Sequence, residues 1–382
     1  MLKDSCGLFF EVGQAQGGGV SLGCKGETAM IAAAVSGGVD SLYALASLRL
    51  KGEDVLAIHG IFHEGGAQSP AIEGLWQNCA RLSVPLHVAD LRAAFRERVM
   101  RPFAERYAAC ETPNPCAMCN ARIKFGLLWD KAEELGAGSL ATGHYARSAA
   151  HPRYGWALVP PADPRKDQSY FLSLVPAERL KRALFPLEGV RKDEARAFVA
   201  SHGLSVPLPR ESQEICFVPN DDYRSFLDAF GLALPGPGDV ALVDEEGACR
   251  VIGCHQGLWR YTEGQRRGLG IAFTEPLYVL GKDRAKNTLL VGSEKQLRQP
   301  CCEAGEINLL VDPALWPKEL FVRIRYRQKA MPARVELTEG NAMRIAFAEP
   351  QPLGAPGQVA AVFDAEGALL GGGILRGRAA LP

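Results

Sequence analysis

Short apolar runs alternate with longer amphipathic stretches between about residues 30 and 202. The runs predict buried strands, and the stretches have the spacing of helices. Strands that alternate with helices in this way predict a parallel, doubly wound α/β sheet with helices on both faces. The predicted strands are 30–35, 55–58, 86–88 and 139–141, and the predicted helices are 41–50, 91–107, 123–135 and 192–202.

The pattern changes beyond about residue 235, where closely spaced β-like runs predict a small barrel or sandwich. These runs include residues 320–326, 333–337, 343–347, 359–363 and 369–374. The chain has 382 residues, more than one hydrophobic core usually serves, so we expect two or three domains. Residues 1–27 show little periodicity around a run of three glycines and predict a loosely ordered extension.

The composition is that of a folded protein, with 47% hydrophobic and 23% charged residues. The 43 basic residues balance the 43 acidic ones, so any affinity for nucleic acid must come from local basic patches. The N-terminus lacks the features of a signal peptide and no apolar run could span a bilayer, which points to the cytosol. In a large cytosolic protein, 11 cysteines favour metal binding, redox chemistry or buried thiols over a disulfide framework.

The first predicted strand runs into the string Ser36-Gly37-Gly38-Val39-Asp40-Ser41, and a helix follows. Backbone N–H groups at a helix N-terminus, two glycines and two hydroxyls make a site for phosphate. Asp40 is placed either to cap the helix or to help hold Mg²⁺. An ordinary strand-to-helix turn is the alternative for a bare glycine pair, but the full string resembles the pyrophosphate loop of the ATP pyrophosphatase superfamily, whose members cleave ATP to AMP and pyrophosphate.

Two cysteine strings indicate what the nucleotide activates. Residues 112–120 form a proline-bearing turn that delivers Cys116 and Cys119 just before a predicted helix, whose dipole would lower a thiol pKa. Residues 211–217 place Cys216 in a polar stretch. With the phosphate loop, these strings resemble the tRNA-specific 2-thiouridylase family, and the resemblance extends from about residue 28 to the C-terminus. Further matching strings are residues 141–147, 166–172, 264–270, 325–328 and 371–374.

The resemblance implies a role for each matching residue. Cys119 would be the nucleophile, and Cys216 would carry a persulfide. The nucleotide would be bound by Ala34, Val35, Ser36, Gly37, Gly38, Val39, Asp40, Ser41 and Gly143. The target base would lie against Asn114, Pro115 and Cys116. Other parts of the tRNA would be contacted by Lys166, Asp167, Gln168, Arg325 and Tyr326.

The resemblance also implies a reaction and a domain layout. ATP, with Mg²⁺, would adenylate the C2 oxygen of the wobble uridine of tRNA, releasing pyrophosphate. Sulfur from the Cys216 persulfide would then attack C2 and release AMP, while Cys119 either frees hydrosulfide or resolves the persulfide as a disulfide. A desulfurase or relay protein would supply the sulfur. The domains would be a catalytic α/β domain (residues 28–212), a central domain with tRNA contacts (213–283) and a C-terminal β-barrel (284–382).

Cys116 departs from many family members, which carry Asp at this position, although others carry Cys. Cys116, Cys119 and Cys216 together are three candidate thiolates, and such a trio can hold an iron-sulfur cluster. The alternatives for Cys116 are a thiol for redox exchange, a zinc ligand or an inert small residue.

Two other functions fit part of the sequence. A different ATP pyrophosphatase, a synthetase acting on a small molecule, would not need the Cys216 string or a C-terminal barrel. An inactive RNA-binding relative would not need the complete phosphate loop together with both cysteine strings.

Overall fold

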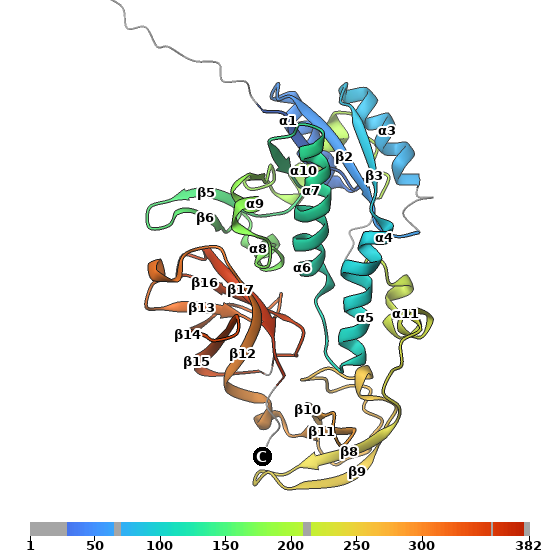
Figure 1. The fold of residues 1–382 in the computed structure, drawn as a ribbon, viewed down its shortest axis with the longest axis vertical. Helices are drawn as coiled ribbons and strands as arrows, with labels where there is room; N and C mark the ends of the chain where they lie inside the picture. Colours follow the sequence, from blue (N-terminus) through green and yellow to red (C-terminus); the bar gives the residue numbers. More distant parts are fainter. Residues whose placement is uncertain (1–28, 65–69, 209–214, 353, 378–382) are drawn as a thin grey trace, which may run out of the picture.

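The computed structural model describes residues 29–64, 70–208, 215–352 and 354–377. The predicted extension, residues 1–27, lies outside these ranges, as do the first four residues of the Cys216 string. The described chain forms an α/β domain at the top of Figure 1, a small sheet domain at the bottom and a barrel at the left. No helix in these ranges is long and apolar enough to cross a bilayer.

The N-terminal sheet has five parallel strands in the order β3-β2-β1-β4-β7. Its strands are β1 (Ile31–Ala34), β2 (Val55–Ile61), β3 (Leu86–Asp90), β4 (Ser139–Ala141) and β7 (Ala183–Leu184). The parallel α/β sheet predicted from the alternating pattern is therefore confirmed. Strand β7 was not predicted, because two residues give no period.

Strand β1 is buried on both faces of this sheet. Ala32 packs into one core with Phe103, and the next residue, Ala33, packs into the opposite core with Leu45. Successive side chains of a strand point to opposite faces, so a strand buried on both sides has a continuous apolar run. This packing is why the central strands could be recognised in the sequence.

Three of the longer helices that surround this sheet are α1 (Val39–Leu50), α3 (Pro70–Leu82) and α10 (Lys192–Ser201). Two composite helices run down from the sheet between the other domains (Figure 1). The first joins α4 (Arg92–Phe95), a π-helical turn (Arg96–Met100) and α5 (Arg101–Ala108). The second joins α6 (Pro115–Cys119), a π-helical segment (Asn120–Leu127) and α7 (Leu128–Glu134). The second begins earlier than the predicted residue 123.

The central sheet has the order β10-β11-β8-β9. Its strands are β8 (Gly238–Val243), β9 (Cys249–His255), β10 (Tyr278–Asp283) and β11 (Thr288–Gly292). The domain boundary expected after residue 283 would separate β10 from β11, which pair antiparallel. We therefore propose a boundary after Gly292. Short helices outside the main layers are α8 (Ser169–Leu172), α9 (Ala177–Lys181) and α11 (Tyr223–Phe230), with 3₁₀ turns at Pro164–Lys166, Pro219–Asp221, Leu258–Arg260, Glu294–Leu297 and Pro313–Leu315.

The C-terminal strands close into a barrel, because β12 pairs with both β15 and β17. The barrel strands are β12 (Arg298–Leu309), β13 (Leu320–Arg323), β14 (Met331–Thr338), β15 (Ala342–Pro352), β16 (Val359–Phe363) and β17 (Leu369–Leu375). A hairpin of the α/β domain, β5 (Arg147–His151) and β6 (Gly155–Val159), extends this sheet through Leu158, which pairs with Leu369. The barrel is thus joined directly to the α/β domain.

Candidate active site

The phosphate loop connects β1 to α1 in a preformed conformation. Gly37 has a φ of 90°, a region that favours glycine, and Gly38 is extended at the N-terminus of α1. The Ser41 hydroxyl donates to the Gly38 carbonyl at 3.0 Å and accepts from the Ser36 amide at 3.1 Å. Within the described residues no side chain caps α1, so its first N–H groups point at the place where an anion would bind.

Asp40 does not cap α1, so that alternative is wrong. Both of its carboxylate oxygens lie 2.7 Å from Nζ of Lys192, at the start of α10. The Tyr145 hydroxyl also donates to Asp40, at 3.1 Å. Lys192 was not singled out in the sequence. The available signal was a lysine at the N-terminus of a helix, where the dipole disfavours a positive charge.

The segment after β4 lies against the phosphate loop, because β4 pairs with β1. A Cβ atom at Gly143 would come within 2.8 Å of the Asp40 carbonyl carbon and the Ser41 nitrogen. His144 follows Gly143 in this segment and is buried, and its Nδ1 lies 2.9 Å from the Thr142 hydroxyl. Burial, followed by the charge of Lys124, lowers the pKa of His144 well below its usual value.

The turn before α6 is held by hydrogen bonds from its own α/β domain and from the C-terminal barrel. The Asn114 side chain accepts from the Ala117 amide at 3.2 Å, and Pro115 follows it as the first helical residue. From the barrel, the Gln358 side chain donates to the Thr112 carbonyl at 2.7 Å. Gln358 is a second residue that the sequence did not reveal, because it lies 246 positions from its partner.

The three predicted thiols influence one another electrostatically, although Cys216 comes from a segment far along the chain. The pKa of Cys119 is raised to about 12, mainly by burial and to a smaller extent by the thiols of Cys216 and Cys116. Cys116 and Cys216 reach the surface, but protein atoms surround much of each sulfur and this desolvation raises both pKa values. All three are free thiols. The expected dipole-lowered pKa is therefore wrong for this state, because both early cysteines lie within α6 and desolvation dominates.

Lys124 is the cation shared by this centre. Its charge lowers the pKa of Cys116, Cys119 and Cys216, opposing the effect of desolvation. It lies in the π-helical segment that follows Cys119. Hydrogen bonds in a π-helix join residues five apart, which brings Lys124 toward the side of Cys119, whereas an α-helix would rotate it away by roughly 140°.

An iron-sulfur cluster does not fit this arrangement. Among the side chains that the structure describes, no group of three or more His, Cys, Asp or Glu residues is placed to hold a metal ion. Cys116, Cys119 and Cys216 are included in that set.

Several predicted tRNA contacts are engaged inside the protein. Asp167 is buried and accepts from the Ser169 amide and hydroxyl, at 2.9 and 3.0 Å. The Gln168 side chain accepts from the Tyr145 amide at 2.9 Å. Arg325 donates to the Glu263 carbonyl at 3.3 Å, and the Tyr326 ring lies 4.4 Å from that of Phe171. These side chains are therefore held by contacts within the protein.

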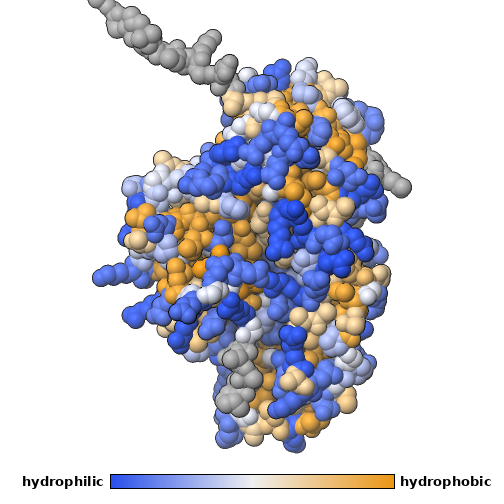
Figure 2. All heavy atoms as spheres, viewed as in Figure 1, coloured by the Kyte–Doolittle hydropathy of each residue, from blue (hydrophilic) through white to orange (hydrophobic). Residues whose placement is uncertain are grey.

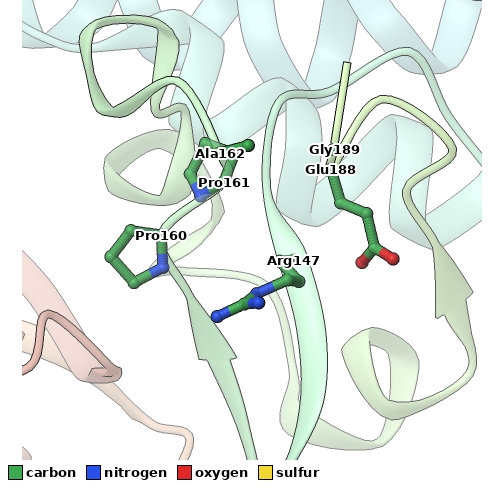
Figure 3. A pocket seen from close by; sticks show the side chains of 6 residues that line it. All are labelled: Arg147, Pro160, Pro161, Ala162, Glu188 and Gly189. Carbon is green, nitrogen blue, oxygen red and sulfur yellow. The ribbon is translucent and has the colours of Figure 1, made fainter.

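The surface beyond the thiols is mixed in character. Hydrophilic and hydrophobic areas are interspersed over the face seen in Figure 2. A hollow of about 240 Å³ lies beside the β5–β6 hairpin, and its lining includes Arg147, Pro160 and Glu188 (Figure 3). It includes no residue of the phosphate loop and none of the three thiols.

Three family models match the chain in succession. Residues 29–220 match a domain described as tRNA methyl transferase HUP domain, and residues 226–293 match the tRNA methyl transferase PRC-barrel domain. Residues 299–375 match the Aminomethyltransferase beta-barrel domain. The three matches follow the order of the α/β sheet, the central sheet and the barrel.

Curated relatives match nearly the whole chain. The tRNA-specific 2-thiouridylase MnmA of Nitratidesulfovibrio vulgaris is 53% identical over 352 residues, which cover 91% of this chain and 99% of the relative. The protein of the same name from Lawsonia intracellularis is 50% identical over 351 residues, covering 90% and 98%. The solved U34-tRNA thiolase NcsA from Methanococcus maripaludis is a distant likeness, with 16% identity and a TM-score of 0.33 over 53% of this chain and 65% of that one.

Proposed function

The chain belongs to the tRNA-specific 2-thiouridylase family, and we propose that it acts on the wobble uridine of tRNA with Cys119 and Cys216 as its sulfur-handling residues. It is an ATP-dependent tRNA-uridine 2-sulfurtransferase. What supports the assignment of residues most is that Cys216, from a segment far along the chain, interacts electrostatically with Cys119 of α6. A buried and an accessible thiol at one place suit a relay of sulfur.

The family models carry the words methyl transferase, whereas the relatives of about half identity are 2-thiouridylases. The chemistry of the site favours sulfur transfer. Methyl transfer would leave the coupled thiols without a role. The phosphate loop is suited to a nucleoside triphosphate. The relatives and the residues therefore support the same activity.

The first step is the activation of the uridine. The first N–H groups of α1 bind phosphate, together with the hydroxyls of Ser36 and Ser41. Gly143 lets the segment after β4 approach the nucleotide closely. The C2 oxygen of uracil attacks the α-phosphorus of ATP, and pyrophosphate leaves. We propose that Mg²⁺ enters on the phosphates of ATP, since Asp40, the carboxylate of the loop, is paired with Lys192.

The second step is sulfur transfer. The terminal sulfur of a Cys216 persulfide attacks C2, and the adenylated oxygen leaves as AMP. The thiolate of Cys119 then attacks the Cys216 sulfur, forms a disulfide and releases 2-thiouridine. A dithiol reductant must reduce this disulfide before the next turnover. Because Cys119 is a thiol with a raised pKa in the free protein, the tRNA complex must lower that pKa, with Lys124 as the available cation.

The sulfur donor must reach Cys216, and its exposed position allows this. We propose a persulfide-bearing desulfurase or relay protein as the donor. The substrate is tRNA, whose target base must leave its stack to reach Cys119, which is 8% exposed. Such a reaction would take place in the cytoplasm. We propose no iron-sulfur step, because the described thiols do not fit a cluster.

Product analysis tests this function. The protein is incubated with ATP, Mg²⁺, a persulfide donor and unmodified tRNA, and 2-thiouridine, AMP and pyrophosphate are quantified. We expect the three products in equal amounts, and none of the thiolated product with Cys119→Ser or Cys216→Ser. Cys249→Ser is the matched control, since Cys249 is exposed on β9 in the central sheet. Full activity of Cys216→Ser would disprove the assignment.

A further inference from the structure

Cys216 lies in a tight turn whose other side chains pack against the protein. The Val218 amide donates to the Ile215 carbonyl at 3.0 Å, so Cys216 and Phe217 are the two central residues of a four-residue turn. Phe217 and Val218 are buried, and Ile215 packs against the same core. Of these four residues only Cys216 is exposed. The packing of its neighbours therefore sets the position of the Cys216 sulfur.

The Phe217 ring is surrounded by three other rings. Its centroid lies 5.6 Å from that of Phe95 and 5.2 Å from that of Phe103, and both pairs have the edge-to-face geometry that aromatic rings favour. The third ring, that of Phe226, lies 5.3 Å away. These partners come from α4, α5 and α11. Because consecutive Cα atoms are about 3.8 Å apart, the ring cannot move far in this cluster without moving Cys216 as well.

The π-helical turn between α4 and α5 aligns two of these rings. Phe95 and Phe103 are separated by eight positions, and an uninterrupted α-helix would turn residues so spaced about 80° apart around its axis. The π-helical turn at Arg96–Met100 winds by a smaller angle per residue, which brings both rings to Phe217. The departure from α-helical geometry therefore serves the contact with the Cys216 turn.

Cys119 belongs to the same hydrophobic core as Phe217, so one packed unit positions both sulfurs. We propose that Phe217 is a positioning residue for sulfur transfer, which holds the Cys216 sulfur where it can reach both C2 of the target base and the thiol of Cys119. This rests on the proposed function and adds a residue to it. Phe217 acts through the backbone that it shares with Cys216, because its ring is packed into the core.

Separate measurements of sulfur loading and sulfur transfer test this role in the full-length protein. Glutathione persulfide passes its terminal sulfur to Cys216 and leaves as glutathione, and mass spectrometry of the Cys216 peptide follows this loading. The donor is then removed, and ATP, Mg²⁺ and unmodified tRNA start a single turnover. We expect Phe217→Leu to slow the formation of 2-thiouridine about tenfold and to change the loading rate less than about twofold, because Cys216 stays exposed to the donor. Phe217→Met, whose flexible side chain fills more of the space of the ring, should be intermediate.

Phe226→Leu is the matched control, since Phe226 belongs to the same ring cluster but lies on α11 and not beside a cysteine. It should lose as much stability in urea as Phe217→Leu and keep the wild-type transfer rate. Equal slowing by the two variants would overturn the proposal, because it would show that the cluster acts only through stability. Unchanged transfer in Phe217→Leu, or loading that slows as much as transfer, would also overturn it.

A second measurement needs neither ATP nor tRNA. The two thiols of Cys119 and Cys216 are equilibrated with oxidised glutathione, which yields the protein disulfide and two molecules of glutathione. The effective concentration of one thiol at the other should fall about tenfold in Phe217→Leu and stay unchanged in Phe226→Leu. An unchanged value in Phe217→Leu would overturn the proposal. A loaded wild type that makes no 2-thiouridine would instead refute the proposed function, and the disulfide equilibrium would still test the role of Phe217.

Discussion

Replacing Gly143 by alanine tests whether the segment after β4 sets the shape of the phosphate loop. The new Cβ would lie 2.8 Å from the Asp40 carbonyl carbon and the Ser41 nitrogen, and both are backbone atoms. Ordinary Cβ contacts begin at about 3.4 Å, so the loop or the segment must retreat by roughly 0.6 Å. Overpacking of this kind costs about 1–3 kcal/mol.

Two measurements, the dissociation constant of ATP and unfolding in urea, show whether this free energy is lost from nucleotide binding or from stability. If the loop retreats, the dissociation constant of ATP rises about 5- to 150-fold, which corresponds to that free energy. If the loop holds, the free energy of unfolding in urea falls by the same amount. Gly189→Ala is the matched control, because a Cβ there meets no atom within 4 Å. Unchanged ATP affinity together with unchanged stability in Gly143→Ala would refute the reasoning.

The remaining predictions concern the thiols and the packing around them. Burial raises the pKa of Cys119 to about 12, so its alkylation in the free protein should keep accelerating above pH 9. Lys124→Met should slow the reaction at neutral pH. Mass spectrometry of the labelled peptide checks both, and a plateau near pH 9 would contradict the buried thiol. Lys282→Met removes the ammonium 3.5 Å from the Glu263 carboxylate, which is 6% exposed, and should lower the free energy of unfolding by about 3–5 kcal/mol. Burial already raises the pKa of Glu263, so in this variant the folded state binds the proton more tightly than the unfolded one and stability should fall as pH rises above about 4.5; urea unfolding that becomes harder at pH 8 than at pH 5 would contradict this. Asn114→Ala removes the cap of α6 and should cost about 1 kcal/mol in the same urea assay, whereas no loss would mean that the barrel alone fixes the turn.

The sequence predicted elements whose burial leaves a local pattern. Strands β1 and β2 have apolar residues on both faces, so the runs stand out. The individual strands of the central sheet were not predicted from the sequence. Strand β9 is exposed or half-buried along most of its length, and its residues vary too little in polarity to show a period. The β5–β6 hairpin was also missed, because its place is fixed by pairing with the distant β17.

The chemistry of the site was predictable only in part. The motif strings located the loop and the thiols, because each string is contiguous. Lys192 and Gln358 were not found, since each contributes through a partner more than a hundred positions away. The thiol pKa was wrong for a physical reason: a helix terminus can be predicted from sequence, but the desolvation of Cys119 depends on the packing of the whole chain.

The central claim is that sulfur passes through Cys216 to tRNA. The most direct measurement loads the protein with isotopically labelled persulfide, removes the donor, and follows the label by mass spectrometry after ATP and unmodified tRNA are added together. We predict that the label leaves the Cys216 peptide and appears, mole for mole, as 2-thiouridine in a single turnover that requires ATP. Label that stays on Cys216, or label that reaches uridine equally well from the Cys216→Ser variant, would contradict the account.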